Sequence, residues 1–402
     1  MSTEHRRRAE APVAKVDFVN MDVDPARGES ASPQPRNHAL AQQGAFALDG
    51  TLVVNSRTLV DEALKEPGLF SSENLVEQGN TLPLIPLNVD PPGHRKYRKL
   101  LDPLFAPKRI DALDEDIALR VNGFIDAFAD RGSCDFTAEL AELFPSSVFL
   151  SMMGLPWEEL HVLMELRNGL LRPGTAEMTP QERSAIQRET AQRVYEYFGA
   201  ILDDRAASPR DDILSLFCTS EVDGDRLTRD EALAICFVLL TAGLDTVTDS
   251  LTCFFAFLAQ HERHRRRIAE QPDIIPDAVE ELLRWETPVP AVVRWAREDA
   301  AIGGEAVEAG HHVMVNLSAA NVDPAEFDDP LEVRFDRPVN RHLAFGGGIH
   351  RCLGSHLARR ELRIALREWH RRIPDYTLAP GYEVTYLRGV RFVPDLQLVW
   401  ST

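Results

Sequence analysis

A glycine-flanked cysteine near the C-terminus constrains the fold of this chain more than any other feature. Residues 345–354 read F-G-G-G-I-H-R-C-L-G, and the three glycines permit left-handed or crowded backbone conformations. Apolar residues then recur at helical spacing as far as Trp369. Cys352 is therefore expected where an irregular loop enters a helix. Backbone amides and the helix dipole at such a point favour the thiolate, the form that binds metals.

Four interpretations of this cysteine compete. A buried structural cysteine does not account for the neighbouring glycines and histidine. A phosphate loop needs a lysine and a correctly spaced second glycine, which the stretch lacks. A zinc site built from His350, Cys352 and His356 is chemically possible, although no fourth ligand is visible nearby. A haem held by one axial thiolate needs close approach of the backbone and amides that donate to the sulfur, and this loop offers both.

Composition narrows the classes of function. The chain has 402 residues, of which 44% are hydrophobic and 27% are charged, as in an ordinary globular protein with a sizeable core. The net charge of −19 repels phosphate backbones, so we expect no nucleic-acid partner. Length alone favours two or three domains.

The pattern along the chain instead predicts a mainly α fold, one helix-rich domain with small β-sheets. Residues 1–40 are predicted to form an irregular arm, and residues 41–402 a single domain without a linker or repeat. Helical periodicity dominates from 90 to about 290, where Thr228 and Glu231 have the spacing of a capping box. Short strands are expected around residues 46–54, 300–315 and 382–399.

Cysteine usage and charge placement bear on location. Five widely spaced cysteines with no C-x-x-C pair, and Arg6 to Arg8 without a following apolar region, indicate a reducing cytoplasm and no secretory leader. The apolar stretch Ala232–Gln260 resembles a membrane span, but Asp245 and Asp249 would be costly in lipid. We therefore expect a long helix buried in protein and no membrane association.

That stretch also carries a polar stripe. Its members recur at helical spacing and are Thr241, Asp245, Thr248, Asp249 and Thr252. Such a stripe can simply satisfy buried polar groups or face water. Gly243 argues for more, because a mid-helix glycine costs about 1 kcal/mol relative to alanine and permits close approach of another group.

These residues resemble a known family. F-G-x-G-x-H-x-C-x-G is the haem-binding signature of the cytochrome P450 monooxygenases, and residues 345–354 match every fixed position. The stretch A-G-L-D-T at 242–246 matches the family's [AG]-G-x-[DE]-T motif. By that resemblance, Thr246 stabilises the oxygen species at the iron and Asp245 relays protons towards it. Val247 departs from the pattern, because many members place a second hydroxyl residue there.

The resemblance also assigns the groups that bind the cofactor. It implies non-covalent haem b, because the covalent C-x-x-C-H motif is absent, with Cys352 as the axial iron ligand. The haem-contacting residues that it implies are His94, Arg98, Ala242, Gly243, Arg294, Phe345, Gly346, His350 and Gly354. Among these, the two histidines and the two arginines match family positions that hold the propionates. Glu281, Arg284 and Arg337 match a buried structural network that braces the loop before the cysteine.

The implied activity is hydroxylation of a small hydrophobic molecule, terpenoid-like or aromatic, with O2 and two electrons. The closest similarity is to the bacterial camphor-hydroxylase branch, but Leu82 replaces a hydrogen-bonding tyrosine there, so camphor itself is a poor candidate. Candidate pocket residues are Leu82, Leu240, Val289, Val292, Val390 and Phe392. Alternatives are a tailoring oxidase of natural products that performs epoxidation or ring coupling, and a zinc- or haem-binding sensor without oxygen chemistry.

Electrons are expected from a ferredoxin and a ferredoxin reductase that draws on NAD(P)H, and the chain is expected to be monomeric. Residues 353–372, which follow the cysteine, contain six arginines against two glutamates, an exception in an acidic chain. We expect an acidic ferredoxin to dock on this basic face. The residues assigned to the face are Arg98, Arg359, Arg360 and Arg363.

Overall fold

The structure of the protein, a computed structural model, describes residues 32–48, 50–73, 79–174, 178–222, 224–387 and 390–402. Most of the expected N-terminal arm, residues 1–31, lies outside the described residues. Residues 34–40 were expected to be irregular but form the first part of helix α1, Gln34–Gln43, which begins directly after Pro33. A proline ring presets a backbone φ compatible with helix, so the start of this helix agrees with its sequence.

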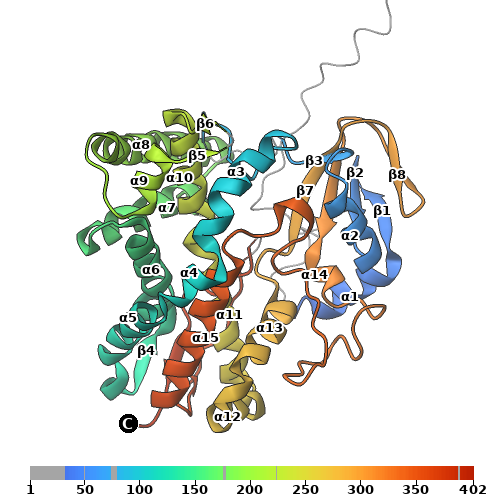
Figure 1. The fold of residues 1–402 in the computed structure, drawn as a ribbon. Coiled ribbons are helices and arrows are strands. Elements are labelled where there is room, and N and C mark those ends of the chain that lie inside the picture. Colours follow the sequence, from blue (N-terminus) through green and yellow to red (C-terminus); the bar gives the residue numbers. More distant parts are fainter. Residues whose placement is uncertain (1–31, 49, 74–78, 175–177, 223, 388–389) are drawn as a thin grey trace, which may run out of the picture.

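Helices form most of the molecule, as the sequence predicts, and crowd the left and centre of Figure 1. Before the break described below they are α1, α2 (Arg57–Lys65), α3 (Gly93–Leu101), α4 (Pro107–Asp111), α5 (Asp114–Asp126), α6 (Leu143–Met153), α7 (Leu160–Leu171), α8 (Pro180–Ala207), α9 (Ile213–Thr219) and α10 (Arg229–Gly243). After it come α11 (Asp245–Gln260), α12 (Glu262–Glu270), α13 (Ile275–Glu286), α14 (Leu317–Ala320) and α15 (Ser355–Arg372).

The largest sheet among the described residues lies at the opposite side from α5–α9, on the right of Figure 1. Its five strands run in the order β1 (Ala45–Leu48), β2 (Thr51–Val54), β10 (His312–Asn316), β7 (Ala291–Ala296) and β3 (Phe70–Ser71). The remaining small sheets contain β4 (Ser133–Asp135), β5 (Glu221–Val222), β6 (Asp225–Arg226), β8 (Ala300–Ile302), β9 (Glu305–Val307), β11 (Thr377–Leu378) and β12 (Gln397–Val399). The stretch 46–54 was expected as one strand, but its described residues belong to two strands, β1 and β2, which pair antiparallel.

The long apolar helix expected over Ala232–Gln260 is interrupted. Helix α10 ends at Gly243, Leu244 lies in a turn, and α11 starts at Asp245. The Thr246 hydroxyl donates to the Ala242 carbonyl, and the Thr248 hydroxyl donates to the Leu244 carbonyl. Such bonds compete with the backbone ladder, and a glycine adds conformational freedom, so the break occurs where both coincide. At its N-terminus, α10 has the predicted capping box of Thr228 and Glu231.

The two halves of this element pack into different parts of the core. Helix α10 packs with α7, α8 and α9, whereas α11 packs with α6, α13 and α15 around the fully buried Trp369. Residues 229–260 are long and apolar enough to cross a membrane by length and composition, but 72% of the most apolar window is buried inside the protein. The apolar composition of residues 229–260 is therefore explained by their burial in the core of the protein.

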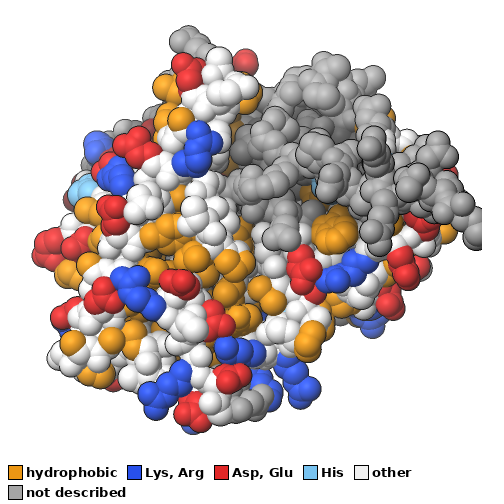
Figure 2. Space-filling model, turned by 90° about the horizontal axis from the view of Figure 1, so that it is seen from above, with side chains coloured by type: hydrophobic (Ala, Val, Ile, Leu, Met, Phe, Trp, Pro, Cys, Tyr) orange, Lys and Arg blue, Asp and Glu red, His pale blue; other side chains and the backbone are white. Residues whose placement is uncertain are grey.

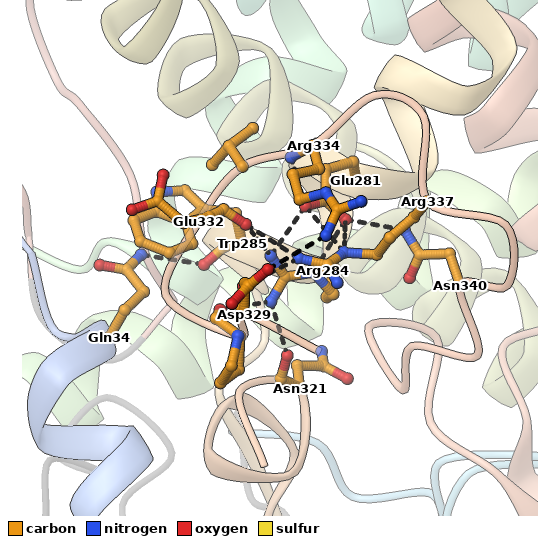
Figure 3. A network of polar contacts seen from close by, with 12 residues as sticks. Gln34, Glu281, Arg284, Trp285, Asn321, Asp329, Glu332, Arg334, Arg337 and Asn340 are labelled. Carbon is orange, nitrogen blue, oxygen red and sulfur yellow. Dashed lines mark hydrogen bonds and ion pairs between the residues drawn. The ribbon is translucent and has the colours of Figure 1, made fainter. Parts of the chain in front are cut away.

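A buried ion network holds the C-terminal loops to α13 (Figure 3). Arg284 donates to both carboxylate oxygens of Glu281 at 2.8 Å, and Arg337 donates to the same carboxylate at 3.0 Å. The remaining guanidinium donors reach backbone carbonyls, among them those of Asn321 and Glu332. Because Glu281 and Arg284 are fully buried, every polar atom in the network has to find its partner inside the protein.

We predict that Glu281→Gln lowers the free energy of unfolding by about 3–5 kcal/mol, because it leaves two buried guanidinium groups without their counter-ion. Urea denaturation monitored by circular dichroism measures the change. Arg266→Ala, which removes an exposed ion pair with Glu262, is the matched control and should leave the midpoint nearly unchanged. Equal midpoints for Glu281→Gln and the unsubstituted protein would contradict this prediction.

Candidate active site

The cysteine loop is held in shape by its own backbone and by α2. The Cys352 amide donates to the Phe345 carbonyl at 2.9 Å, which closes the loop just before α15 begins at Ser355. Gly346 and Gly348 both have positive φ, +63° and +62°. A Cβ atom at Gly348 would collide with the Leu64 carbonyl oxygen of α2. This position therefore excludes any side chain, and the loop can lie close to its neighbours.

The electrostatic environment of Cys352 combines opposing effects. The residue is accessible and forms no disulfide, yet the protein packed around it raises the pKa of its thiol. The Gly354 amide and the positive charges of Arg98, Arg351 and Arg359 act in the other direction. The effect of burial on the thiol pKa is larger than that of the backbone amide, which was expected from the sequence to favour the thiolate. A metal ion bonded directly to the sulfur would reverse this balance, because coordinating thiols are deprotonated.

Three basic side chains meet beside this loop, and the Asp90 carboxylate, 3.6 Å from His350, balances them only in part. Arg294 on β7 is buried, and burial lowers its pKa to about 10, against an opposing effect of the Asp90 charge. The rings of His94 on α3 and His350 lie 4.6 Å apart, and Nε2 of each is buried without a hydrogen-bond partner among the described residues. Arg294, His350, Gly346 and Gly347 line a cavity of about 70 Å³.

This donor set fits a haem. Buried cations and donors without partners are costly unless an anion completes them, and the propionates of a haem are such anions. Arg98, further along α3, is half-buried, pairs with Asp102 at 2.8 Å and donates to the Arg351 carbonyl beside the cysteine. The sequence-predicted groups on α3, on β7 and in the cysteine loop are therefore brought to one place.

Sequence reasoning did not single out the residues that brace these groups. The buried Asp90 carboxylate accepts from the Ser71 hydroxyl at 2.6 Å and from Arg297 at 2.7 Å. Its Oδ1 atom lies 3.6 Å from His350 Nε2. Asp90 and Arg297 stand within the motif stretches that contain His94 and Arg294, and this proximity in sequence was the available signal.

The interrupted helix has a short accessible strip next to the break. Ala242 and Gly243 are exposed and Thr246 is partly exposed, although most of their neighbours on α10 and α11 are buried. A Cβ atom at Gly243 would lie 3.6 Å from the Phe149 ring, which is ordinary contact. The accessible residues are thus those that the family motif identifies.

The predicted polar stripe does not share this accessible strip. The hydroxyls of Thr241, Thr248 and Thr252 donate to backbone carbonyls, and Thr248 reaches across to Ala141. Asp245 and Asp249 instead pair with Arg172, which follows α7. The side chains of the stripe therefore point into the protein. Most of them satisfy buried polar groups, which is the simpler of the two roles expected from the sequence.

The six candidate pocket residues fall into two sets. Val292 lines the cavity beside Arg294, while Val289, Val390 and Leu82 are partly buried. The Leu82 amide donates to the Tyr195 hydroxyl of α8 at 3.2 Å, which holds this segment on that helix. In contrast, Leu240 of α10 is fully buried in the hydrophobic core. Phe392 is buried as well, with the Arg172 guanidinium 4.0 Å from its ring.

The arginines expected to form a basic face are paired with acids. Arg359 and Arg363 both contact Glu280 of α13, and Arg360 contacts Asp111 and Asp114. These carboxylates come from other parts of the chain. The comparison of arginines with glutamates within residues 353–372 therefore overestimated the positive charge of this face. The three arginines line a cavity of about 160 Å³ together with His356. On the face shown in Figure 2, acidic and basic side chains are likewise interspersed.

Comparison with known proteins identifies the family. The family model described as Cytochrome P450 matches residues 158–369. The chain is 31% identical over 382 residues to a steroid C26-monooxygenase of Mycobacterium tuberculosis, covering 94% of this chain and 96% of the relative. It is 33% identical over 322 residues to the mycinamicin IV hydroxylase/epoxidase of Micromonospora griseorubida, covering 78% and 75%.

A solved structure agrees with this relationship. The crystal structure of CYP109E1 from Bacillus megaterium in complex with testosterone superposes with a TM-score of 0.83 at 25% identity, over 92% of this chain and 100% of that one. The five-stranded sheet, the helix-rich remainder and the cysteine loop before α15 are thus those of a well-characterised architecture. This chain belongs to the cytochrome P450 family and is an oxidoreductase, a haem-dependent monooxygenase that uses O2 and electrons from a redox partner.

Proposed function

We propose that this chain is a haem-thiolate monooxygenase that hydroxylates a hydrophobic substrate and holds non-covalent haem b through Cys352. The observation that carries the proposal is the set of buried basic groups beside the cysteine loop, His94, Arg294 and His350, in which Nε2 of both imidazoles lacks a hydrogen-bond partner among the described residues. Arg98 completes the propionate-binding set, and Phe345, Gly346, Gly354, Ala242 and Gly243 are the remaining contacts. The bound haem activates O2 with two electrons that originate from NAD(P)H.

The chain's own residues manage protons and water in this proposal. Thr246 presents its hydroxyl on the accessible strip, and Asp245 follows the helix break directly before it. Asp245 passes a proton on and Thr246 positions it at the substrate side of the helix. Because the neighbouring residues of α10 and α11 are buried, water reaches this strip only along a restricted path.

For the substrate, we propose a terpenoid-like molecule, including polycyclic ones. Support comes from the partly buried apolar side chains of Leu82, Val289, Val292 and Val390 and from the similarity to a steroid C26-monooxygenase. Leu240 and Phe392, which are buried, are the remaining candidate pocket residues. An aromatic substrate, and a place in the camphor-hydroxylase-like branch, are further proposals from the sequence motifs. The similarity to a hydroxylase/epoxidase favours a tailoring oxidase as the second candidate function.

We also propose that residues 41–402 form one domain, active as a monomer in the cytoplasm and without a membrane or nucleic-acid partner. Helix α6 contributes to two of the three apolar clusters, and β7 links one of these to the third, which supports the single domain. The five cysteines, all outside disulfides, support a reducing compartment. A sensor without oxygen chemistry is the least supported function, because it has no use for the Asp245–Thr246 pair.

The ligand assignment is tested by spectroscopy. The dithionite-reduced protein with carbon monoxide should show the strongly red-shifted Soret band of thiolate-ligated haem. Cys352→Ser should lose that band, because a hydroxyl does not replace the thiolate donor. Cys218→Ser, which changes a half-buried cysteine elsewhere, is the control and should keep it. Purified protein that contains zinc and no haem would overturn the proposal.

The proton-delivery role is tested by Thr246→Ala. Oxygen consumption should persist, while product formed per O2 falls by about tenfold or more and hydrogen peroxide rises, in line with a general acid–base contribution. An oxygen electrode, chromatography of the product and a peroxide assay measure the three quantities. Thr219→Ala is the matched control, since the Thr219 hydroxyl also donates to a carbonyl four residues back. Unchanged coupling in Thr246→Ala would mean that protons travel by another route.

We further propose that a ferredoxin, supplied by a ferredoxin reductase, docks beside α15 at Arg98, Arg359, Arg360 and Arg363. The position of this helix directly after Cys352 supports the proposal, as do the 30% and 34% exposed side chains of Arg360 and Arg363. The pairing with Glu280, Asp111 and Asp114 reduces the local excess of positive charge.

Arg363→Glu should therefore raise the apparent KM for an acidic bacterial ferredoxin by roughly tenfold, with kcat at saturation nearly unchanged. Steady-state kinetics at low ionic strength measure both constants. Arg193→Glu reverses an exposed arginine on α8 and should have no effect. An unaltered KM in Arg363→Glu would reject this docking face.

A further inference from the structure

A cluster of charged residues lies behind the accessible strip, where the C-terminus of α7 meets the starts of α6 and α11. Arg172 Nη2 lies 2.6 Å from Asp245 Oδ1 and 3.5 Å from Asp249 Oδ1. The other terminal nitrogen of Arg172 lies 2.9 Å from Glu142 Oε1. One guanidinium group therefore contacts three carboxyl groups. Arg167, which is fully buried, adds a second positive charge beside Glu142 and Asp245.

The charges in this cluster do not balance if every carboxyl group is ionised. Three carboxylates would face two guanidinium groups, and an unbalanced buried charge is expensive. Asp249 is the member that can remain neutral, because its side chain is 1% exposed and its Oδ2 atom has no hydrogen-bond partner in the described part of the chain. Burial and the neighbouring Asp245 charge raise the pKa of Asp249 well above its usual value.

A neutral Asp249 holds a proton one helical turn from Asp245. The two residues are four apart on α11 and so share a face of the helix. The Asp249 carboxyl group has an O–H to give, and the Asp245 carboxyl group, which accepts from Arg172, offers oxygens that can receive it. The Cys253 thiol also interacts with Asp249, but burial raises the pKa of this thiol, so it stays neutral and does not alter the balance.

We propose that Asp249 is a positioning residue for proton delivery, a buried carboxylic acid that reloads Asp245. The inference rests on the proposed function, in which Asp245 gives up a proton towards Thr246. The proton leaves Asp249 and arrives at the Asp245 carboxylate, and Asp249 becomes the carboxylate. Arg172 already contacts both groups, so the guanidinium exchanges its closer partner and the total charge of the cluster does not change.

The solvent side of the cluster restores the proton. The side chains of Arg172 and Glu142 are 26% and 21% exposed, compared with 12% for Asp245 and 1% for Asp249. A proton from water therefore enters past these two side chains and returns to Asp249. The accessible strip at Ala242, Gly243 and Thr246 can then stay dry, because water need not enter from the substrate side to supply the proton.

The test is Asp249→Asn, which keeps the size of the side chain and cannot donate a carboxyl proton. Glu361→Gln is the matched control, because Glu361 on α15 is a second buried carboxyl group whose pKa is raised by burial and lies outside the cluster. The unsubstituted holoenzyme and both variants are compared by infrared spectroscopy in H2O and D2O, by product formed per O2, and by the solvent isotope effect. The carbon monoxide spectrum and thermal unfolding accompany each variant.

The proposal expects a carbonyl band of a protonated carboxylic acid, shifted in D2O, that Asp249→Asn removes. It also expects product per O2 to fall by about tenfold in Asp249→Asn, with a larger solvent isotope effect, and to stay unchanged in Glu361→Gln. Loss of the band with unchanged coupling and isotope effect would overturn the relay and leave Asp249 structural. Absence of the band from the unsubstituted enzyme would overturn the neutral acid itself. Absence of the thiolate carbon monoxide band would instead refute the proposed function.

Discussion

The buried pairing of Glu281 with Arg284 and Arg337 is the interaction on which the C-terminal part of the molecule depends. One carboxylate on α13 receives both guanidinium groups, and their outer nitrogens bind carbonyls from segments 321–332. The Asn321 side-chain oxygen in turn accepts a hydrogen bond of 2.6 Å from the Leu343 amide, at the start of the cysteine loop. Three stretches of irregular chain are thus tied to one helix. Irregular backbone leaves carbonyl groups without hydrogen bonds to neighbouring backbone, and the buried guanidinium groups supply the missing donors here.

The contrast between this network and the groups beside Cys352 indicates where the chemistry lies. Around Glu281, each guanidinium nitrogen finds an acceptor. Around Arg294 the reverse holds, because several basic groups share the one Asp90 carboxylate and two imidazole nitrogens are left without hydrogen-bond partners among the described residues. A folded protein tolerates such an incomplete set only where binding completes it. The Asp249 cluster differs, because it has three carboxyl groups against two guanidinium groups.

Much of the fold followed from patterns that are local. The capping box at Thr228 and Glu231, the helical start after Cys352 and the mainly α class were all predicted correctly, and the family assignment was confirmed. The long buried helix predicted over Ala232–Gln260 is present, but it is divided at Leu244 into α10 and α11, where threonine hydroxyls compete with the backbone next to Gly243. The irregular arm was predicted to extend to residue 40, whereas α1 begins at Gln34.

The sequence by itself determined the chemistry that each motif can supply, because glycine, cysteine, histidine and arginine act through properties that they have in any fold. It could not reveal which charges would meet. Glu280 neutralises two arginines of α15, Asp90 and Arg297 brace His350, and Arg172 joins Asp245 to Asp249 across distant parts of the chain. Such pairings depend on packing between elements, and burial then sets the cost of each charge, so only the tertiary structure decided them.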